Sequence, residues 1–330
     1  MRELALAAFA AETGSHVVEQ PRERRFEQFR RRFDGARYLA SLSERGLSFV
    51  ARSAPDYPEL LRELHDPPPG LFLRGAGGAE LLRRPTVAIV GARACSSYGG
   101  HVARLLGREL AAAGLVVLSG LARGVDGEAH RGALEAGGVT IAILGCGIDR
   151  DYPAAHAQLA RRICERGLVA SEYAPGVEPA PWRFPARNRI VAGLAAATVI
   201  VEARERSGAL ITADFALETG REVFAVPGEI TSSLSAGTNA LLRLGATPLT
   251  GSADVLEALG VTPAQATASE LSESAAAVLG ALATEPAGAD QLVRSTGLDA
   301  ASVATALAEL ELAGAVAQAD GLYRGMRRPG

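Results

Sequence analysis

The sequence predicts an α/β protein built on a doubly wound, mostly parallel sheet, with a small helical segment before it and a small helical domain after it. The main observation is that short apolar runs alternate with helical patterns from residue 86 to residue 228. This alternation is typical of βαβ units, whose sheet is covered by helices on both faces. A second observation is that three helical patterns followed by two short strand patterns lie near the C-terminus, in the order of a winged helix.

The composition is ordinary for a globular protein with one large and one or two small domains. Of the 330 residues, 48% are hydrophobic and 22% are charged, which is sufficient for a large core. No apolar run reaches the ~18 residues that a membrane helix needs, so we expect no contact with a membrane. The N-terminus lacks the features of a signal peptide, and Cys95, Cys146 and Cys164 lack metal-site or disulfide spacing. We therefore expect a cytoplasmic protein.

The basic residues are unusual because every one of them is arginine. The 34 basic residues include no lysine, and the net charge of the chain is -3. Codon bias across the genome is the simplest explanation, but the physical consequence is the same: each cationic contact is made by a planar guanidinium group. Because the chain is slightly acidic overall, nucleic acid could bind only to a local basic patch.

Residues 1–52 are expected to form a small domain that is helical up to residue 50. Phe26, Phe29 and Phe33 recur at helical spacing within a run of arginines. These arginines are either a nucleic-acid contact or the solvated face of a helix over a small aromatic core. We favour the solvated face, because glutamate and aspartate interrupt the run. Prolines and a glycine within residues 57–70 then predict an extended connector.

The central domain is predicted to span residues 53–260 and to contain buried strands. Each strand pattern is a short run, rich in branched apolar residues, that ends near a small residue. The runs are residues 86–93, 115–120, 139–147, 168–172, 197–203 and 222–228. Helical patterns fill the intervals, most clearly at residues 209–220. In an open α/β sheet of this kind, ligands bind beyond the carboxyl ends of the strands, where the strand order reverses.

A linker rich in alanine is expected at residues 261–270, followed by a winged-helix domain at residues 271–326. Ser272 or Ser274 is placed to cap the first helix and Asp299 the third, and an Asp-Gly pair marks a turn between two short strands. The third helix contains no arginine, whereas helices that bind in the major groove present Arg, Lys, Asn or Gln. A protein-interaction or structural role is therefore at least as well supported as DNA binding.

The segment FPARNRIVAGL is the strongest candidate for a binding site. It contains Arg187, Asn188 and Arg189 directly before an apolar run, and Arg183 lies just upstream. No aspartate or glutamate occurs in residues 179–201, although the chain is acidic overall. Guanidinium groups close to an amide and to aromatic rings are suited to phosphates and unstacked bases.

Residues suited to ligand binding also follow the predicted strands. Arg93 comes directly after the first strand, and glycines or serines follow most of the others. Small residues at these positions let a ligand approach the backbone, and the N-termini of the following helices offer N–H donors to anions. Each position alone is typical of an ordinary turn, but several at one edge of a sheet indicate a binding site. Arg93 is expected to clamp a phosphate there; the alternative is a surface ion pair.

No residue set indicates a catalytic centre. Asp126 and His130 are four residues apart and lie on one helix face, as an acid–base or metal pair would. We favour a capping aspartate beside a packed histidine, since no third ligand has matching spacing. Ser119 lacks the G-x-S-x-G turn of a hydrolase, and no dinucleotide-binding or P-loop motif occurs. We therefore expect a binding protein with no catalytic residue, no metal and no cofactor.

The motifs and their order resemble those of the DNA processing protein A (DprA, also called Smf) family. The resemblance covers residues 57–246 and rests on YPELL with HDPPPGLFLRG, VAIVGARACSSYG, LSGLARGVDGEAH, GCGIDRDYP, SEY, FPARNRIVAGL, VEARERSGALIT, GREVFAVPG and GTNALLRLGA. It implies an extended Rossmann-like fold, with a reduced SAM-like helical domain before it and a winged helix after it. It also implies a cytoplasmic homodimer that binds single-stranded DNA and helps load the RecA recombinase, as in natural transformation.

By motif match, the resemblance places the DNA site on the strand ends and on the FPARNRIVAGL segment. The implied contacts are Arg93, Arg187, Asn188 and Arg189, supported by Ser119, Gly120, Gly124, Ser207 and Gly208. Family members often use lysines near this pocket. Since this chain has none, Arg183 or other arginines are expected to replace them.

Two other functions are compatible with parts of the sequence. A nucleotide-processing enzyme of the phosphoribohydrolase type, on a related Rossmann-like fold, would need a carboxylate near a ribose, supplied by Glu172, Glu202 or Glu229. The P-G-G-x-G-T motif of such enzymes is not present, because Pro227-Gly228 continues as Glu-Ile-Thr. The other function is a transcription factor that uses the winged helix, and the arginine-free third helix argues against it.

Overall fold

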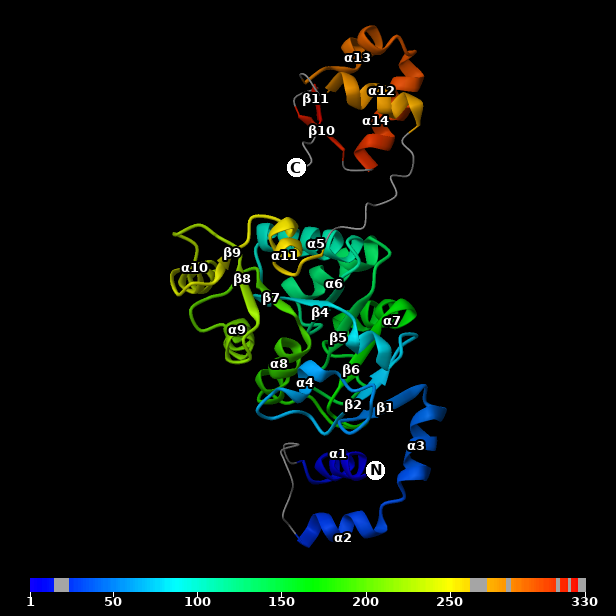
Figure 1. The fold of residues 1–330 in the computed structure, drawn as a ribbon, viewed down its shortest axis with the longest axis vertical. Coiled ribbons are helices and arrows are strands. Elements are labelled where there is room, and N and C mark those ends of the chain that lie inside the picture. Colours follow the sequence, from blue (N-terminus) through cyan, green and yellow to red (C-terminus); the bar gives the residue numbers. More distant parts are fainter. Residues whose placement is uncertain (15–23, 262–271, 283–285, 313–314, 320–321, 326–330) are drawn as a thin grey trace. The chain divides into compact units, whose positions relative to one another are not determined.

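The structure is a computed structural model that describes residues 1–14, 24–261, 272–282, 286–312, 315–319 and 322–325. The chain divides into two units, residues 1–263 and residues 264–330 (Figure 1). Nearly all of the predicted linker, and the Asp-Gly turn of the winged helix, lie outside the described residues. Within the described ranges, no helix combines the length and the apolar character needed to cross a membrane.

The first unit is organised around a nine-stranded sheet with the strand order β1-β2-β6-β5-β4-β3-β7-β8-β9. The strands are β1 (Leu47–Ala51), β2 (Gly70–Arg74), β3 (Thr86–Val90), β4 (Val116–Ser119), β5 (Thr140–Ile143), β6 (Leu168–Ser171), β7 (Ala197–Ile200), β8 (Glu222–Ala225) and β9 (Thr247–Pro248). Strands β3 to β9 pair in parallel, whereas β1 pairs with β2, and β2 with β6, in antiparallel fashion. The predicted doubly wound, mostly parallel sheet is therefore confirmed.

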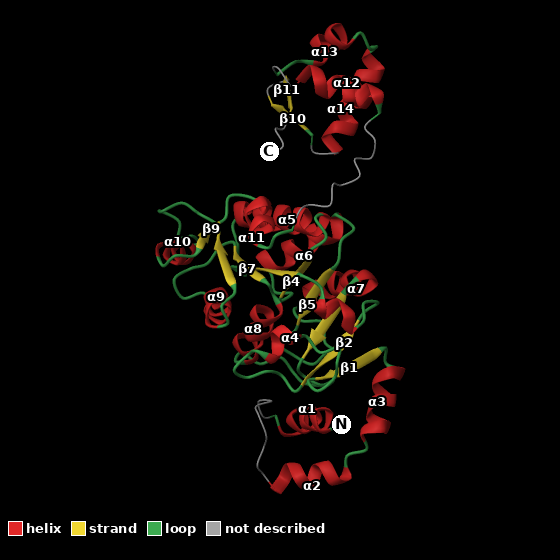
Figure 2. Cartoon of the chain, viewed as in Figure 1, coloured by secondary structure: helices red, strands yellow, loops and turns green. Residues whose placement is uncertain are grey.

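Helices cover both faces of this sheet (Figure 2). They are α4 (Glu59–Arg62), α5 (Ser97–Ala112), α6 (Val125–Glu135), α7 (Ala157–Arg166), α8 (Arg183–Leu194), α9 (Gly208–Glu218), α10 (Ala236–Arg243) and α11 (Ser252–Ala258), with the short 3-10 helices η1 (Ala79–Arg83) and η2 (Ala154–His156). Val87 and Ile89 of β3 pack in one core with α5, α6 and α11, whereas Ala88 and Val90 pack in another with α8 and α9. Successive side chains of a strand point to opposite faces, so a single apolar run supplies both cores.

The N-terminal residues were predicted to be helical, and those that the structure describes up to residue 44 form three helices. These are α1 (Arg2–Thr13), α2 (Arg24–Arg32) and α3 (Gly35–Glu44). Phenylalanines at helical spacing build their shared core: the ring of Phe9 lies 5.5 Å from that of Phe26 and 5.4 Å from that of Phe29, and Phe29 stacks on Phe33. Aromatic pairs at such distances add to the stability given by apolar burial.

The expectation that the helical segment continues to residue 50 is wrong. Residues 47–51 form strand β1, which pairs with β2, and the ring of Phe49 lies 4.8 Å from that of Phe72 across the pair. The sequence did not reveal this pair because a strand of five residues shows too few repeats of the two-residue period. The partner strand also lies beyond the proline-rich stretch that was expected to be only a connector.

The second unit has the predicted layout of a winged helix. It consists of α12 (Glu273–Leu282), α13 (Ala289–Thr296), α14 (Ala300–Leu312), β10 (Val316–Ala319) and β11 (Leu322–Gly325), with the two strands antiparallel. The hydroxyl oxygen of Ser272 accepts the N–H of Ala275 at the start of α12, and the carboxylate of Asp299 accepts the N–H of Ser302 at the start of α14. Both predicted caps are thus confirmed.

Candidate nucleic-acid interface

A pocket of about 630 Å³ opens at the carboxyl edge of the sheet, beside the ends of β3 and β7. The chain crosses the sheet in one direction from β3 to β6 and then returns to place β7 on the other side of β3. The strand order therefore reverses between β3 and β7, which is where open α/β sheets bind ligands. The pocket is lined by the segments that follow β3, β4 and β7 and by one face of α8.

The structure brings part of the predicted site together in this pocket. The predicted residues that line it are Arg93, Gly120, Arg187, Asn188, Ser207 and Gly208. The other predicted residues, Ser119, Gly124, Arg183 and Arg189, are not among its lining residues. The hydroxyl of Ser119 donates to the carbonyl oxygen of Ile89 within the sheet (2.7 Å), and Gly124, with φ of 72°, forms the turn into α6.

Helical geometry separates residues of the FPARNRIVAGL segment that are adjacent in the sequence. The segment forms most of α8. Phe184, Arg187, Asn188 and Val191 recur at helical spacing and line the pocket from one face of α8. Arg189 lies on a different face. Arg187 and Arg189 therefore lie on different faces of α8, and the helix does not direct both of them to one ligand.

Arg187 is a buried cation at the pocket wall. Its guanidinium donates to the carbonyl oxygens of Gly120 (2.9 Å) and Ile143 and lies near Asp126, whose carboxylate accepts the N–H groups of Gly120 (3.1 Å) and Ala122 (3.3 Å). Burial lowers the pKa of Arg187, but an arginine has so high a pKa that it stays charged. A Cβ on Gly120 would lie 2.3 Å from this guanidinium, which explains the glycine there.

Arg189 is instead committed to two carboxylates inside the protein. Its guanidinium forms a bidentate ion pair with Glu172, at 3.0 and 2.7 Å, and its Nε lies 3.4 Å from a carboxylate oxygen of Asp66. The side chain of Glu172 is fully buried and that of Arg189 is 7% exposed. Because Glu172 directly follows β6, the pair ties α8 to that strand. Arg189 is therefore a positioning residue for the pocket.

Arg183 is also engaged within the protein. Its guanidinium donates to the carbonyl oxygen of Glu178 and lies over the rings of Tyr173 (5.3 Å) and Trp182 (4.8 Å). Such stacking on aromatic faces is typical of arginine and would be poorly reproduced by lysine. The buried guanidinium at the start of α8 thus holds the loop that precedes the helix.

The exposed positive charge of the pocket comes from the loops rather than from α8. Arg93 follows β3, while Arg204 and Arg206 follow β7, and all three side chains are exposed at the pocket. Among the described residues, none of the three forms an ion pair, and Asp126 is the only acid in the lining. Arg204 and Arg206 were not predicted from the sequence. They could have been found, because they follow a strand at the point where the strand order reverses, as Arg93 does.

Aromatic rings form a stack at the same pocket. The Arg93 guanidinium lies 5.2 Å from the centre of the Phe184 ring, and the Phe184 ring lies 5.2 Å from that of Tyr152 with an interplanar angle of 28°. Tyr152 is 42% exposed, so the outer end of this stack is open to solvent. Tyr152 belongs to the motif GCGIDRDYP, but no role was predicted for it from the sequence. A planar ligand could extend the stack on Tyr152.

His130 is a buried, packed histidine, as we favoured. The capping role expected for Asp126 is wrong, because the N-cap of α6 is Gly124, without a side-chain cap, and the Asp126 carboxylate instead accepts N–H groups of the preceding loop. Thr140 donates its hydroxyl to the carbonyl oxygen of Val117, so the short contact of 2.7 Å between its Oγ1 and Nδ1 of His130 requires Nδ1 to be the donor. Burial lowers the pKa of His130 to about 3. This side chain is therefore neutral at physiological pH. In the part of the chain that the structure describes, no group of three or more His, Cys, Asp or Glu could hold a metal ion.

The burial of His130 should make the free energy of unfolding depend on pH. An unfolded histidine takes up a proton below a pKa of about 6.5, whereas folded His130 stays neutral until the pH falls near its pKa of about 3. Its contribution to stability is complete above pH ~6.5 and is lost as the pH falls, at up to about 1.4 kcal/mol per pH unit. Urea unfolding at several pH values from ~6.5 to 4 measures this effect. The free energy of unfolding should fall less steeply with falling pH in His130→Gln than in wild type. Replacing exposed His101 by glutamine is the control; equal slopes for His130→Gln and wild type would contradict the prediction.

Comparisons with known proteins match both units of this chain. The family model described as DNA recombination-mediator protein A matches residues 48–260, and the DprA winged helix domain model matches residues 262–321. The DNA processing protein DprA of Streptococcus pneumoniae is 45% identical over 219 residues, which are 66% of this chain and 77% of that protein. Protein Smf of Escherichia coli is 39% identical over 284 residues, which are 82% of this chain and 75% of that protein.

Solved structures agree with these matches. The crystal structure of Streptococcus pneumoniae DprA has a TM-score of 0.67 and 37% identity, covering 78% of this chain and 92% of that one. The Helicobacter pylori protein, solved for its single-stranded DNA binding mode, has a TM-score of 0.58 and 32% identity, covering 64% of this chain and 95% of that one. These matches place the chain in the class of DNA-processing recombination mediators. The chain belongs to the DprA family.

Proposed function

We propose that the chain binds single-stranded DNA in the pocket beside β3 and β7. The observation that carries this proposal is the exposed trio of Arg93, Arg204 and Arg206 around buried Arg187, with one acid in the lining. Guanidinium groups bind phosphate oxygens through paired, charge-assisted hydrogen bonds. The N-terminus of α9 also lines the pocket, at Gly208 and Ala209, and a helix N-terminus favours a bound anion.

The stack of Arg93, Phe184 and Tyr152 favours a single strand over a duplex. Only an unpaired base can leave its neighbours and stack on a protein ring, and every base has a face for this contact. Phosphate contacts carry no sequence information, so binding should depend little on sequence. The Helicobacter pylori relative has a single-stranded DNA binding mode, which supports the same ligand.

The positions of the three candidate catalytic carboxylates support a binding role over a catalytic one. Glu172 is paired with Arg189. Glu202 accepts the N–H (2.9 Å) and the hydroxyl (2.5 Å) of Ser96 at the start of α5, and Glu229 does not line the pocket. The three carboxylates that a phosphoribohydrolase-like function would have to use are thus occupied or remote. This supports a binding role over a phosphoribohydrolase-like one.

A RecA partner, a homodimer and a cytoplasmic role in DNA uptake complete the proposal. They are supported by membership of a recombination-mediator family, because a mediator delivers single strands to a recombinase. The winged helix is suited to protein contact, since the exposed positions described in α14 include Ala301, Ala304 and Ala308 and no arginine.

The proposed function is tested by fluorescence anisotropy of labelled oligo-dT with the full chain. We expect binding that resists excess unlabelled duplex and weakens with salt, with a log–log slope of about -0.7 per phosphate neutralised. Mononucleotide hydrolysis is assayed in parallel. No binding of oligo-dT at low salt, together with turnover of a mononucleotide, would replace the proposal with the enzymatic alternative.

Replacing Tyr152 by alanine should weaken oligo-dT binding without changing its salt dependence. Loss of one base–aromatic stack costs about 1–3 kcal/mol, while the phosphate contacts remain. Tyr152→Phe keeps the ring and should bind like wild type. Equal weakening in the two variants would show that the hydroxyl matters instead of the stack.

A further inference from the structure

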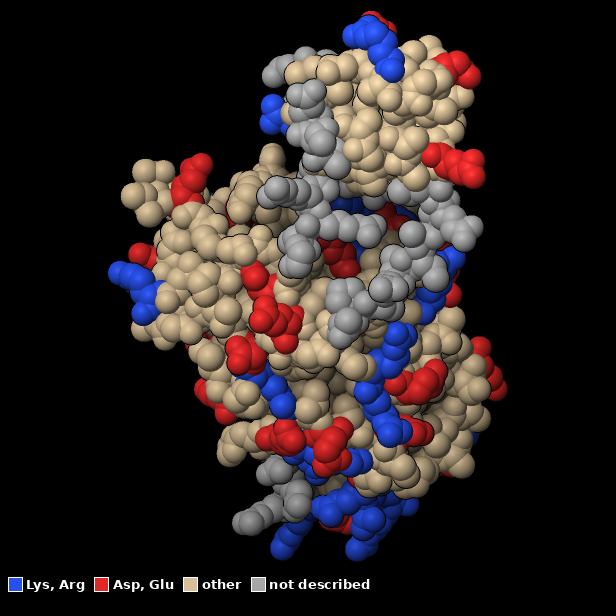
Figure 3. All heavy atoms as spheres, turned by 45° about the horizontal axis from the view of Figure 1, so that its top comes forward, with Lys and Arg blue, Asp and Glu red and all other residues tan. Residues whose placement is uncertain are grey.

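Helix α2 gathers four of its five arginines on one face, and only Arg30 lies off it. At 100° per residue, Arg24, Arg25, Gln28, Arg31 and Arg32 fall within an arc of about 120°. All five side chains are exposed. We call these residues the α2 arginine face. Figure 3 shows basic side chains gathered at the lower end of the view, where the N-terminal helices lie.

Two of the acids that interrupt this run, Glu27 and Asp34, are described by the structure, and both lie off the α2 arginine face. Glu27 is on the flank of the helix and pairs with Arg30, at 2.9 Å. Asp34 lies beyond α2 and accepts the N–H of Arg37 at the start of α3. Among the described residues, no ion pair involves the arginines of the face. From the sequence we favoured a solvated helix face because glutamate and aspartate interrupt the run. In the structure Glu27 lies on the flank of α2 and Asp34 lies beyond its end, so neither dilutes the charge of the face.

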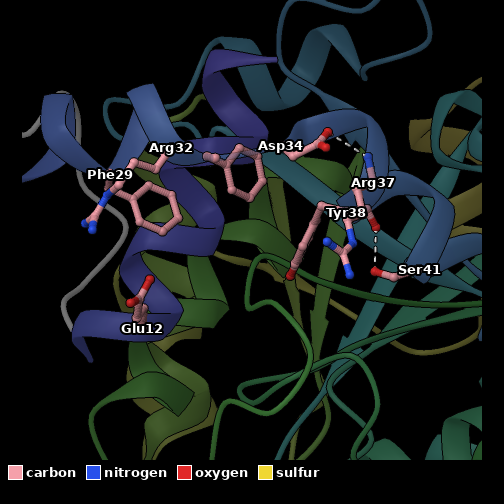
Figure 4. A pocket seen from close by; sticks show the side chains of 8 residues that line it. Glu12, Phe29, Arg32, Asp34, Arg37, Tyr38 and Ser41 are labelled. Atoms are coloured by element: carbon pink, nitrogen blue, oxygen red, sulfur yellow. Dashed lines mark hydrogen bonds between the residues drawn. The ribbon is translucent and has the colours of Figure 1, made fainter.

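The opposite side of α2 is already buried. Phe26 is 1% exposed, and the rings of Phe26 and Phe29 contact Phe9 of α1. Beside them, a pocket of about 490 Å³ lies between α2 and α3. Figure 4 shows Phe29 and Arg32 on one side of this pocket and Arg37 and Tyr38 on the other. A helix that binds a membrane surface inserts its apolar face, and α2 has no apolar face left to insert.

We propose that the α2 arginine face binds the phosphate backbone of duplex DNA, at a surface distinct from the single-strand pocket. The face carries arginines and one glutamine but no aromatic residue, so it can hold phosphates but cannot stack unpaired bases. A duplex offers the denser array of charge, about one per 1.7 Å of helix axis. One chain would then hold a single strand and a duplex at the same time, as a protein at a junction between them must.

The test uses the full chain with Arg24, Arg25, Arg31 and Arg32 replaced by glutamine. A matched control removes the same charge from exposed arginines elsewhere: Arg108, Arg161, Arg162 and Arg243. Binding of a labelled blunt duplex and of labelled oligo-dT is measured by anisotropy across a salt series. For the α2 variant we expect duplex affinity to fall at least about tenfold, and its log-salt slope to become shallower by about 0.9 per lost phosphate contact. Oligo-dT binding should stay within about twofold of wild type in both variants.

Other outcomes would overturn the proposal. If the α2 variant binds duplex as the control variant does, the face has no part in duplex binding. If it loses oligo-dT and keeps duplex, the face belongs to the path of the single strand. Thermal unfolding of both variants verifies that each is folded. Failure of the single-strand pocket would be recognised separately, because wild type itself would then not bind oligo-dT.

Discussion

Replacing Arg93, Arg204 and Arg206 together by glutamine is expected to weaken oligo-dT binding about a hundredfold at low salt. Each exposed guanidinium that binds a phosphate contributes about 1 kcal/mol or more, so three contribute about 3 kcal/mol. The side chains are exposed and form no ion pair among the described residues. Their loss should therefore leave the fold intact. Anisotropy across a salt series measures both the affinity and the number of phosphates contacted.

The salt dependence separates a local site from a general effect of charge. If each of the three arginines contacts a phosphate, the log-salt slope should become shallower by about 2. A control with Arg108, Arg161 and Arg162 replaced by glutamine has the same net charge and should keep the wild-type slope. If the control and the site variant lose affinity equally, the pocket is not the binding site, and a diffuse field of charge would explain the binding.

Replacing Arg189 by alanine is expected to lower the free energy of unfolding by about 3–5 kcal/mol. The variant leaves fully buried Glu172 without the bidentate partner that it has in the wild type. An unpaired buried charge is costly, and among the described residues Glu172 forms an ion pair with Arg189 alone. Urea unfolding monitored by circular dichroism measures the change. A loss under about 1 kcal/mol would contradict the view that the ion pair with Arg189 compensates a costly buried charge.

A double variant distinguishes the role of Arg189 in stability from a role in binding. In Glu172→Gln/Arg189→Met both charges are removed, so much of the lost stability should return. If Arg189 only positions α8, this folded double variant should bind oligo-dT nearly as well as wild type. A large loss of affinity in a stable double variant would instead place Arg189 in contact with DNA, as the family resemblance implied.

The sheet could be predicted from the sequence because its strands carry strong local signals. The buried runs that became β3 to β8 are apolar on both faces, since helices cover both sides. Strands β1 and β2 escaped prediction because their pairing joins segments on either side of a proline-rich stretch. Long-range pairing of this kind leaves little trace in a short window of sequence.

The candidate site could be located from the sequence but not fully assigned. Glycines and arginines after the strands pointed to the edge of the sheet at which the pocket opens, since parallel strands bring their carboxyl ends together. The direction of each arginine on α8 depended on helical phase and on partners distant in the sequence. Arg189, for example, is paired with Glu172, 17 residues away in the sequence. Arg204 and Arg206 were not predicted because attention went to the residues of the family motifs.

The most direct test of the central claim is photo-crosslinking of a single strand that carries iodouracil, followed by mass spectrometry of the linked peptides. The account predicts crosslinks to Tyr152 or Phe184, the rings at the pocket, and competition by unlabelled oligo-dT. The crosslinks should be lost in the variant of Arg93, Arg204 and Arg206. Competed crosslinks confined to the winged helix or to α2, with none at the pocket, would contradict the assignment of the pocket beside β3 and β7 as the single-strand site.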